Sequence, residues 1–423
     1  MILYQGVIYG NIEQNLLIDS LYDDCKKTLS TTKKLTPLKV IYACDKLAKK
    51  VRNKEFDQII LPLLEDLDIT YPQFEQYIAM FEIEALIRKV EVELGKQYME
   101  DVHLEDSLQR IVPLGILFHI AAGNVDLLPA YSIVEGLLAG NINILKLPTG
   151  DNGLSIKLLS ELIMIEPMLK EYIYVFDVPS TEIHTLEKFA QIADGIVVWG
   201  GDLAVEGARK LAPINTKIIA WGHKLSFAYA TVDVTDDDLI DLAKHICTTN
   251  QLLCSSCQGI FVDTSSREEL EKIGRRFFDI LKEENHLHSP VSLGMRSKNA
   301  LMIYNEMLEK HASNKTIYYE EGVSVIISED HELELSLLFR NVWIKPLKRD
   351  QIISQLKSHR NHLQTVGLLT SPTEINELSS ILIDAGLIRI TKAKDMSRVY
   401  VGETHDGTFA LREYTRVVET IYN

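Results

Sequence analysis

Short apolar runs alternate with amphipathic stretches between Arg110 and Gly201. Apolar runs that end near glycine or proline predict buried strands, and apolar residues at helical spacing predict helices, here at about Leu127 to Leu138 and Leu186 to Ala193. Strands that alternate with helices in this way build a parallel sheet with helices on both faces. The runs expected to form its strands are RIVPLGILFHI, NINILK, YIYVF and GIVVW.

A second unit repeats this pattern from Ser226 onward. Its first two strands are predicted at FAYATVDV and GIFVDT, with an amphipathic helix between them that follows the acidic run Asp233 to Asp238. A helix is expected from Arg267 to Glu284, and a largely polar region follows to about Asn314. The C-terminal residues of the chain predict an amphipathic helix. The other expected elements are the strands GVSVIIS, NVWIKPL and LQTVGLLT and the helices Arg349 to Ser358 and Glu374 to Ala385.

Polar and small residues follow the strands of the first predicted sheet. In such sheets ligands bind beyond the carboxyl ends of the strands, which here carry Asn124, Lys146 and the pair Gly200–Gly201. Glycines that open a helix let its backbone N–H groups approach a pyrophosphate. The GxGxxG fingerprint is absent, and a glycine pair or a strand-end lysine by itself equally indicates a turn or a solvated charge.

A polar turn with two cysteines, Cys254 and Cys257, lies within the segment TTNQLLCSSCQGIFV, before a strand expected at Gly259 to Val262. A thiol held in a turn between a helix and a core strand is rigidly placed and reachable, as a nucleophile must be. Two other interpretations are core packing and a thioredoxin-like redox pair. We expect no metal site, because no second CxxC or CxxH follows at ligand spacing.

The charge and cysteine content exclude several classes of protein. A formal net charge of −16 argues against a general nucleic-acid binder, although it leaves room for a local basic pocket. Five cysteines in 423 residues do not form a disulfide framework. We expect a cytoplasmic protein without a signal peptide or a membrane span, since no run approaches the roughly 18 apolar residues that a span requires.

Four stretches of the sequence resemble, in order, segments of the aldehyde dehydrogenase superfamily. Within that superfamily, the details are most similar to the LuxC-type fatty acyl reductases, through GNV, EGLLAGN, CSSCQ, LQTVGL and a late HDG at His405 to Gly407. The resemblance covers about residues 105 to 420. The four stretches are AGNVDLLPA, AGNINILKLPTG, IIAWGHKLSFA and NQLLCSSCQGIFV.

The resemblance implies an aldehyde dehydrogenase-like α/β fold with two doubly wound domains and a helical N-terminal segment. We expect residues 1–108 to pack as this helical segment on a nicotinamide cofactor domain at 109–224. The catalytic cysteine domain is expected at 225–395, and a C-terminal segment at 396–423.

The resemblance also implies roles for individual residues. Its register makes Cys254 the nucleophile and the side-chain amide of Asn124 part of the oxyanion hole. Lys146 matches the lysine that holds the cofactor ribose. Gly222 and Lys224 match a Gly-Gly-Lys-Ser segment in which His223 replaces the second glycine. With Lys146, the residues expected to bind the cofactor are Thr149, Gly200, Gly201 and Gly222.

Two departures from ordinary aldehyde dehydrogenases are informative. Their general base, a glutamate that activates water against the acyl-enzyme, is replaced by Ala220, while the family spacing to Cys254 is kept. A site that has the nucleophilic cysteine but lacks a general base to activate water favours an acyl-enzyme that persists until a hydride reduces it. The segment NVWIKPL lacks the glutamate and glycine that hold the nicotinamide ribose in dehydrogenases, so the sequence identifies no residue for that part.

The resemblance therefore implies a long-chain acyl reductase, which forms a fatty aldehyde from an acyl-CoA or acyl-protein thioester. NADPH is the expected cofactor, because Thr149 stands where many NAD enzymes carry a glutamate that repels a 2′-phosphate. By resemblance we also expect a homo-oligomer and an acyl-protein synthetase partner.

Three other functions fit the same residues. A short-chain CoA-acylating aldehyde dehydrogenase would differ in its preferred acyl length, and a cysteine thioesterase or acyltransferase would need no cofactor. A non-catalytic interaction protein is disfavoured by the presence of Cys254, Asn124 and Lys146.

Overall fold

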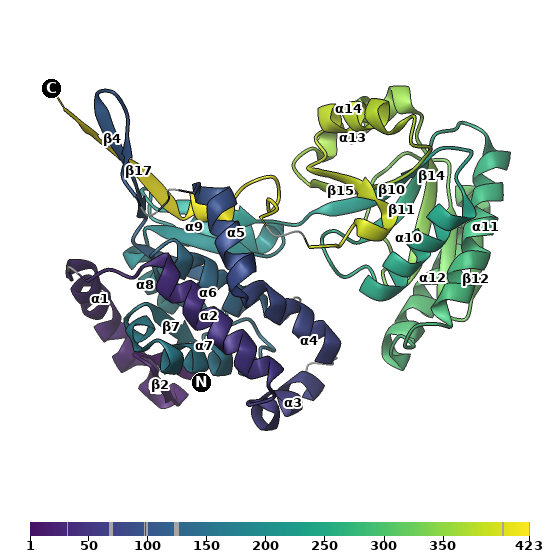
Figure 1. Ribbon diagram of the computed structural model, residues 1–423. Coiled ribbons are helices and arrows are strands. Elements are labelled where there is room, and N and C mark those ends of the chain that lie inside the picture. The colour runs from purple at the N-terminus through teal and green to yellow at the C-terminus, as the bar shows by residue number, and fades with distance from the viewer. Residues whose placement is uncertain are drawn as a thin grey trace. The chain divides into compact units, whose positions relative to one another are not determined.

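The computed structural model describes residues 1–31, 33–66, 71–96, 98, 100–121, 127–399 and 402–422. The chain forms two compact units, the first comprising Met1–Gly222 with Tyr400–Asn423 and the second comprising His223–Val399. Each unit is built on a sheet of its own (Figure 1).

The first unit contains a sheet in the order β2-β1-β7-β6-β5-β8-β9, in which all strands from β7 to β9 are parallel. From β5 the chain continues to β6 and β7 on one side and then to β8 and β9 on the other. The strand order therefore reverses between β5 and β8, which is the point where doubly wound sheets bind ligands. The strands are β1 (Ile2–Tyr4), β2 (Val7–Tyr9), β5 (Ile116–Ile120), β6 (Ile142–Lys146), β7 (Ile173–Phe176), β8 (Gly195–Trp199) and β9 (Lys217–Trp221).

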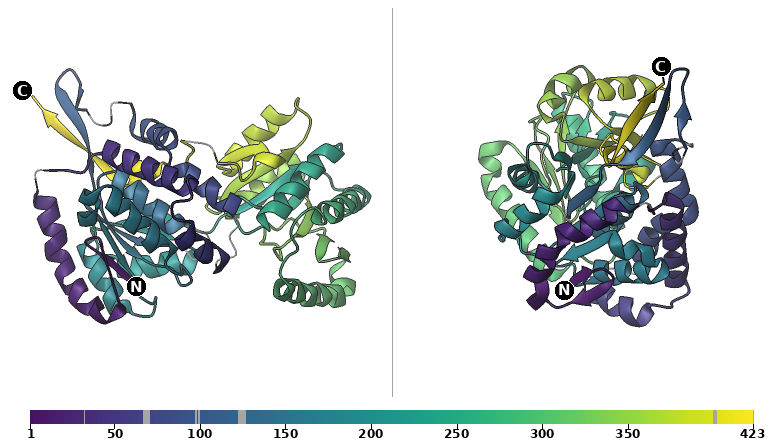
Figure 2. Two further views of the ribbon diagram at one scale, coloured as in Figure 1. Left: turned by 60° about the horizontal axis from the view of Figure 1, so that its bottom comes forward. Right: turned by 90° about the vertical axis from the view of Figure 1, so that its left-hand side faces the viewer.

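Helices cover this sheet, and a layer of N-terminal helices lies outside them. Within that layer α2 packs on α6 and α7 (Figure 2). The crossover helices are α6 (Leu128–Leu138), α7 (Leu154–Ile165), α8 (Ile183–Ile192) and α9 (Asp202–Leu211). The N-terminal helices are α1 (Gln14–Ser30), α2 (Pro37–Arg52), α3 (Asp57–Asp66), α4 (Tyr71–Ile78) and α5 (Ile83–Leu94).

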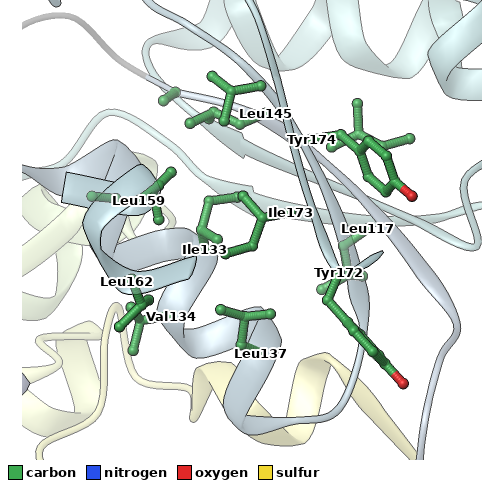
Figure 3. Packing of buried hydrophobic residues seen from close by; sticks show 14 of the residues in the cluster. Leu117, Ile133, Val134, Leu137, Leu145, Leu159, Leu162, Tyr172, Ile173 and Tyr174 are labelled. Carbon is green, nitrogen blue, oxygen red and sulfur yellow. The ribbon is translucent and has the colours of Figure 1, made fainter. Parts of the chain in front are cut away.

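The core of the first unit lies between α6, α7 and the sheet. Leu137 of α6 and Leu162 of α7 are fully buried close to strand residues such as Ile173 (Figure 3). Each such side chain contributes roughly 1.5–3 kcal/mol by burial. Helix α6 approaches β6 closely because it carries Gly136, where a Cβ atom would lie 1.8 Å from Oδ1 of Asn143. This packing sets the position of β6 and of the residue at its carboxyl end.

The C-terminal residues form a strand, so the predicted amphipathic helix there is wrong. Strand β17 (Thr415–Ile421) pairs antiparallel with β4 (Ser107–Pro113), which also pairs with β3 (Val102–His103) (Figure 1). The run predicted as one strand, RIVPLGILFHI, is divided between β4 and β5, which belong to different sheets. Only the short helix α15 (Ala410–Glu413) precedes β17. The β-branched residues of TRVVETI favour a strand once a partner strand is available.

The second unit contains a sheet in the order β12-β13-β14-β11-β10-β15-β16, parallel except for β12. Its order reverses at β10, which lies between β11 and β15. The strands are β10 (Leu225–Ala230), β11 (Cys257–Val262), β12 (Thr316–Glu320), β13 (Val323–Ile327), β14 (Asn341–Pro346), β15 (Leu363–Leu369) and β16 (Arg389–Lys392).

The helices of the second unit include one that the sequence did not predict. Helix α12 (Leu293–Ser313) occupies most of the stretch interpreted as a polar region, and several of its apolar residues, such as Leu301, are exposed. The other helices are α10 (Asp236–Thr249), α11 (Arg267–Asn285), α13 (Ile352–Leu356) and α14 (Ile375–Ala385). Short 3-10 turns over the whole chain are Asn11–Glu13, Ala79–Phe81, Pro167–Glu171, Arg349–Gln351, Lys357–His359 and Ala393–Asp395.

Within the described ranges, the structure contains no helix that is both long and apolar enough to cross a bilayer.

Candidate active site

Cys254 lies in the turn that joins α10 to β11, on the edge of the second sheet where the parallel strands begin. The helix ends at Thr249, and the next two residues, Asn250 and Gln251, adopt left-handed backbone angles, with φ of 47° and 64°. This reversal directs the chain out of α10 into the turn. The side chain of Cys254 is exposed there and forms no disulfide. The predicted nucleophile is thus reachable from solvent and held between two regular elements.

The hydroxyl of Ser226 holds the backbone of this turn. Ser226 is fully buried in β10, and its Oγ donates a hydrogen bond to the carbonyl oxygen of Cys254 at 2.7 Å. Oγ of Ser226 also accepts a hydrogen bond from the backbone N–H of Thr365 in β15 at 3.0 Å. The pairing register of β10 shifts next to Ser226 against both β11 and β15. Its side chain therefore supplies hydrogen bonds where the regular ladder is interrupted.

The buried amide of Gln251 fixes the start of the turn. Its Nε2 donates to the backbone oxygens of Cys257 and Asn341, both at 3.1 Å, and to Oγ of Ser336 at 3.0 Å. Its Oε1 accepts from the backbone N–H groups of Arg340 and Asn341. A buried polar group with all of its partners present specifies one local conformation. The hydrogen bonds of Gln251 consequently fix the backbone where the turn with Cys254 begins.

Cys257 begins strand β11 and is fully buried, so the prediction that it lies in the polar turn is wrong. Its Sγ donates to the carbonyl oxygen of Gly259 at 3.2 Å, and burial raises its pKa to about 12. The neighbouring His245 accepts the backbone N–H of Cys257 on Nε2, and burial lowers the pKa of its imidazole to about 4. Cys257 is therefore a packed thiol beside a neutral histidine, and such thiols are poor nucleophiles.

Lys146 stands at the carboxyl end of β6 in the first unit. Its side chain is buried, and Nζ donates to Oγ of Ser180 at 3.0 Å. Burial lowers the pKa of the Lys146 amine, and the charge of Asp177 opposes that shift. Ser180 and Asp177 follow β7, the strand next to β6. Thr149, in the connection between β6 and α7, is exposed to solvent.

The glycine pair lies where β8 meets α9. Gly200 has φ of 154°, a conformation that side-chain-bearing residues rarely adopt, and its N–H donates to the carbonyl oxygen of Trp221 at 3.1 Å. Gly201 is the N-cap of α9, and no side chain caps the helix there. A Cβ atom on Gly201 would meet nothing within 4 Å. The first N–H groups of α9 are thus open to an anionic ligand, although Asp202 in the first turn adds an exposed negative charge.

Gly222 follows β9, the edge strand of the same sheet. Two residues earlier, Ala220 is exposed on β9 rather than packed in the core. His223 and Lys224 belong to the second unit, where Nζ of Lys224 donates to the carbonyl oxygen of Asn361 at 2.9 Å.

The sheet of the first unit therefore brings together Lys146, Gly200, Gly201 and Gly222 along its carboxyl edge. Cys254 belongs to the other unit, and Asn124 lies outside the described residues. The residues that support the site were not predicted from the sequence. The signal that could have found Ser226 is a hydroxyl inside an otherwise apolar strand. The supporting residues are Ser180, Ser226, His245, Gln251 and Ser336.

In the part of the chain that the structure describes, histidine, cysteine and carboxylate side chains do not gather in groups that could hold a metal ion.

Comparison with known proteins gives a family and a fold. The sequence profile of the acyl-CoA reductase (LuxC) family matches residues 34–417. A long-chain acyl-protein thioester reductase of Photobacterium phosphoreum is 30% identical over 214 residues, which are 49% of this chain and 42% of that protein. The Vibrio harveyi protein of the same name is 26% identical over 353 residues, which are 80% of this chain and 72% of that protein.

Among solved structures, a double mutant of betaine aldehyde dehydrogenase from Staphylococcus aureus, in complex with NAD⁺, has a TM-score of 0.71 to this chain. The match covers 96% of this chain and 89% of that chain at 16% sequence identity. The predicted aldehyde dehydrogenase-like fold is thereby confirmed.

Proposed function

This chain belongs to the acyl-CoA reductase (LuxC) family of oxidoreductases, and we propose that it reduces a long-chain acyl thioester to the aldehyde through an acyl-enzyme on Cys254. The observation that carries the proposal is the contrast between the two cysteines of the turn. Cys254 is exposed on a turn anchored by Ser226, whereas Cys257 is buried with its pKa raised to about 12.

The Cys254 thiolate attacks the acyl carbonyl carbon, and the thiol of CoA or of a donor protein leaves. The Asn124 amide and the Cys254 backbone N–H would stabilise the oxyanion, and the loss of one such donor typically costs about 3–4 kcal/mol. The hydrogen bond from Ser226 to the Cys254 carbonyl oxygen holds the peptide unit that follows the nucleophile and thereby restrains the backbone of the turn.

Ala220 protects the acyl-enzyme from hydrolysis, because its side chain has no carboxylate that could activate water. A general base at this position would activate water and release the acyl group as an acid. The exposed methyl group of Ala220 cannot do so, and the thioester on Cys254 persists until it is reduced.

The carboxyl edge of the first sheet fits a nicotinamide dinucleotide. Lys146 would bind the ribose at the adenosine end, the open N-terminus of α9 the pyrophosphate, and Gly222 would leave room at the end of β9. Thr149 is exposed beside this site and adds no charge against a 2′-phosphate, which favours NADPH over NADH. When bound, the reduced nicotinamide supplies the hydride for the acyl group.

The proposed acyl donors are long-chain acyl-CoA or an acyl group carried by a partner acyl-protein synthetase, and we propose a homo-oligomer. The test is NADPH oxidation and trapped aldehyde with acyl-CoAs of graded length, in parallel with the Cys254→Ala variant. Equal amounts of aldehyde and oxidised cofactor with long-chain substrates would support the proposal. Release of CoA without cofactor oxidation would indicate a thioesterase or acyltransferase, and activity limited to short acyl groups would indicate an acylating aldehyde dehydrogenase.

A further inference from the structure

Three rings meet at the carboxyl ends of β8 and β9. The ring of His405 lies edge-on to Trp199, at 4.9 Å between centroids, and to Trp221, at 5.0 Å. The two indoles lie 5.4 Å apart. Both tryptophans are buried, at 8% and 4% exposure, whereas 39% of the His405 side chain is exposed. Of the three rings, His405 therefore presents the most surface to a ligand.

A tight turn holds His405 in this position. The backbone groups of His405 and Thr408 exchange two hydrogen bonds of 2.9 Å, and the residues between them have positive φ, 48° at Asp406 and 80° at Gly407. Such a turn requires glycine and a residue that tolerates the left-handed region, such as aspartate. The late HDG segment of the sequence is thus the turn that places an imidazole on two indoles.

The side chain of Trp199, on which His405 packs, is held in place as well. Nε1 of Trp199 donates to Oγ of Ser132 at 3.1 Å, and that hydroxyl contacts Nδ1 of His119 at 2.8 Å. His119 is fully buried, and its Nε2 contacts Oδ1 of Asn143 at 3.0 Å. The orientation of Trp199 is therefore set by a chain of buried polar contacts.

The cluster flanks the glycines proposed for the cofactor. Trp199 directly precedes Gly200, and Trp221 directly precedes Gly222 and accepts the N–H of Gly200. A dinucleotide with its adenosine end at Lys146 on β6 and its pyrophosphate at α9 would continue across the sheet. In the order β6-β5-β8-β9, its other end would lie toward β9.

We propose that His405, seated on Trp199 and Trp221, positions the nicotinamide end of the dinucleotide. This inference rests on the proposed function and assigns a residue to the part of the cofactor for which the sequence identified none. The imidazole can form a hydrogen bond with the carboxamide or ribose hydroxyls of the nicotinamide half, and the indoles beneath keep its ring in place. His405 is a positioning residue, because the hydride itself passes between cofactor and substrate.

The test compares two ligands that share the adenosine end, NADPH and 2′,5′-ADP, by calorimetric titration of the full chain. His405→Ala should weaken NADPH binding by about three- to tenfold, the contribution of one hydrogen bond, and leave 2′,5′-ADP binding unchanged. His405→Gln, which can still form a hydrogen bond, should recover part of the affinity. His405→Phe, which keeps ring packing on the indoles, should not. His184→Ala serves as the matched control, because His184 is an exposed histidine on α8 of the same unit.

Equal NADPH affinity in all His405 variants would overturn the inference, and so would a parallel loss for NADPH and 2′,5′-ADP, which would indicate a structural role. In both cases the unaltered chain still binds NADPH, and the proposed function stands. If the unaltered chain binds neither ligand, the proposed function fails first and the role of His405 fails with it.

Discussion

The Oγ of Ser226 lies 2.7 Å from the carbonyl oxygen of Cys254 and 3.0 Å from the N–H of Thr365. One buried hydroxyl therefore ties the turn of the predicted nucleophile to two strands of the second sheet. The register of the sheet shifts at this residue, so the hydroxyl makes these contacts where the regular pairing is interrupted.

Ser226→Ala should lower both stability and the rate of acylation. It leaves the Thr365 N–H without its acceptor, at a cost of about 1–3 kcal/mol in the free energy of unfolding. It also removes the hydrogen bond to the Cys254 carbonyl oxygen. The fold-decrease in the rate of acyl-enzyme formation should therefore exceed any fold-change in cofactor affinity. Urea unfolding and single-turnover acylation measure the two effects. Ser255→Ala is the control, since the hydroxyl of Ser255 in the same turn contacts Oγ of Ser397 at 2.8 Å. Unchanged acylation in a folded Ser226→Ala variant would show that this contact does not position the nucleophile.

Cys254→Ala should abolish covalent labelling by an acyl donor together with aldehyde formation. Cys257→Ala should retain labelling, because the buried thiol with a raised pKa takes no part in the attack. Its cost should be limited to stability, at about 1 kcal/mol for a small cavity in β11. Mass spectrometry of the acylated protein after digestion locates the acyl group. An acyl group on Cys257 in the unaltered protein would contradict the assignment.

Ala220→Glu should divert the acyl-enzyme toward fatty acid. A positioned general base typically contributes 10²–10⁴-fold, or about 3–5 kcal/mol of barrier, to the attack of water. Because Ala220 is exposed on an edge strand, the longer side chain should not disturb the core. The ratio of fatty acid to aldehyde per acyl-CoA consumed is the measurement, with Ala220→Gln as the uncharged control. A folded variant that acylates normally and forms no more acid than Ala220→Gln would refute this role.

Thr149→Glu should reduce the preference for NADPH over NADH by about tenfold, since a carboxylate beside a 2′-phosphate costs on the order of 1 kcal/mol where water surrounds both charges. Thr149 is exposed, so folding should be unaffected. The ratio of kcat/KM for the two cofactors measures the change, and Thr149→Gln separates charge from size. If the unaltered chain is equally or more efficient with NADH, the assignment of NADPH is wrong.

Local patterns in the sequence predicted most of the two parallel sheets. Buried strands such as GIVVW and crossover helices such as α8 can be recognised from the spacing of apolar residues along the sequence. The alternation of strands and helices then restricts the topology. The resemblance predicted roles for Cys254 and Lys146, because both lie in segments that match the family.

Tertiary structure decided the remainder. The residues of β17 could form a helix or a strand, and only pairing with β4, far away in the sequence, favours the strand. The different fates of Cys254 and Cys257 depend on where β11 begins. Residues distant along the chain also meet in the hydrogen bond between Ser226 and Thr365. The same holds for the packing of His405 on Trp199 and Trp221. A sequence pattern records the period of one segment, whereas such contacts arise only when segments that do not encode each other's position are packed together.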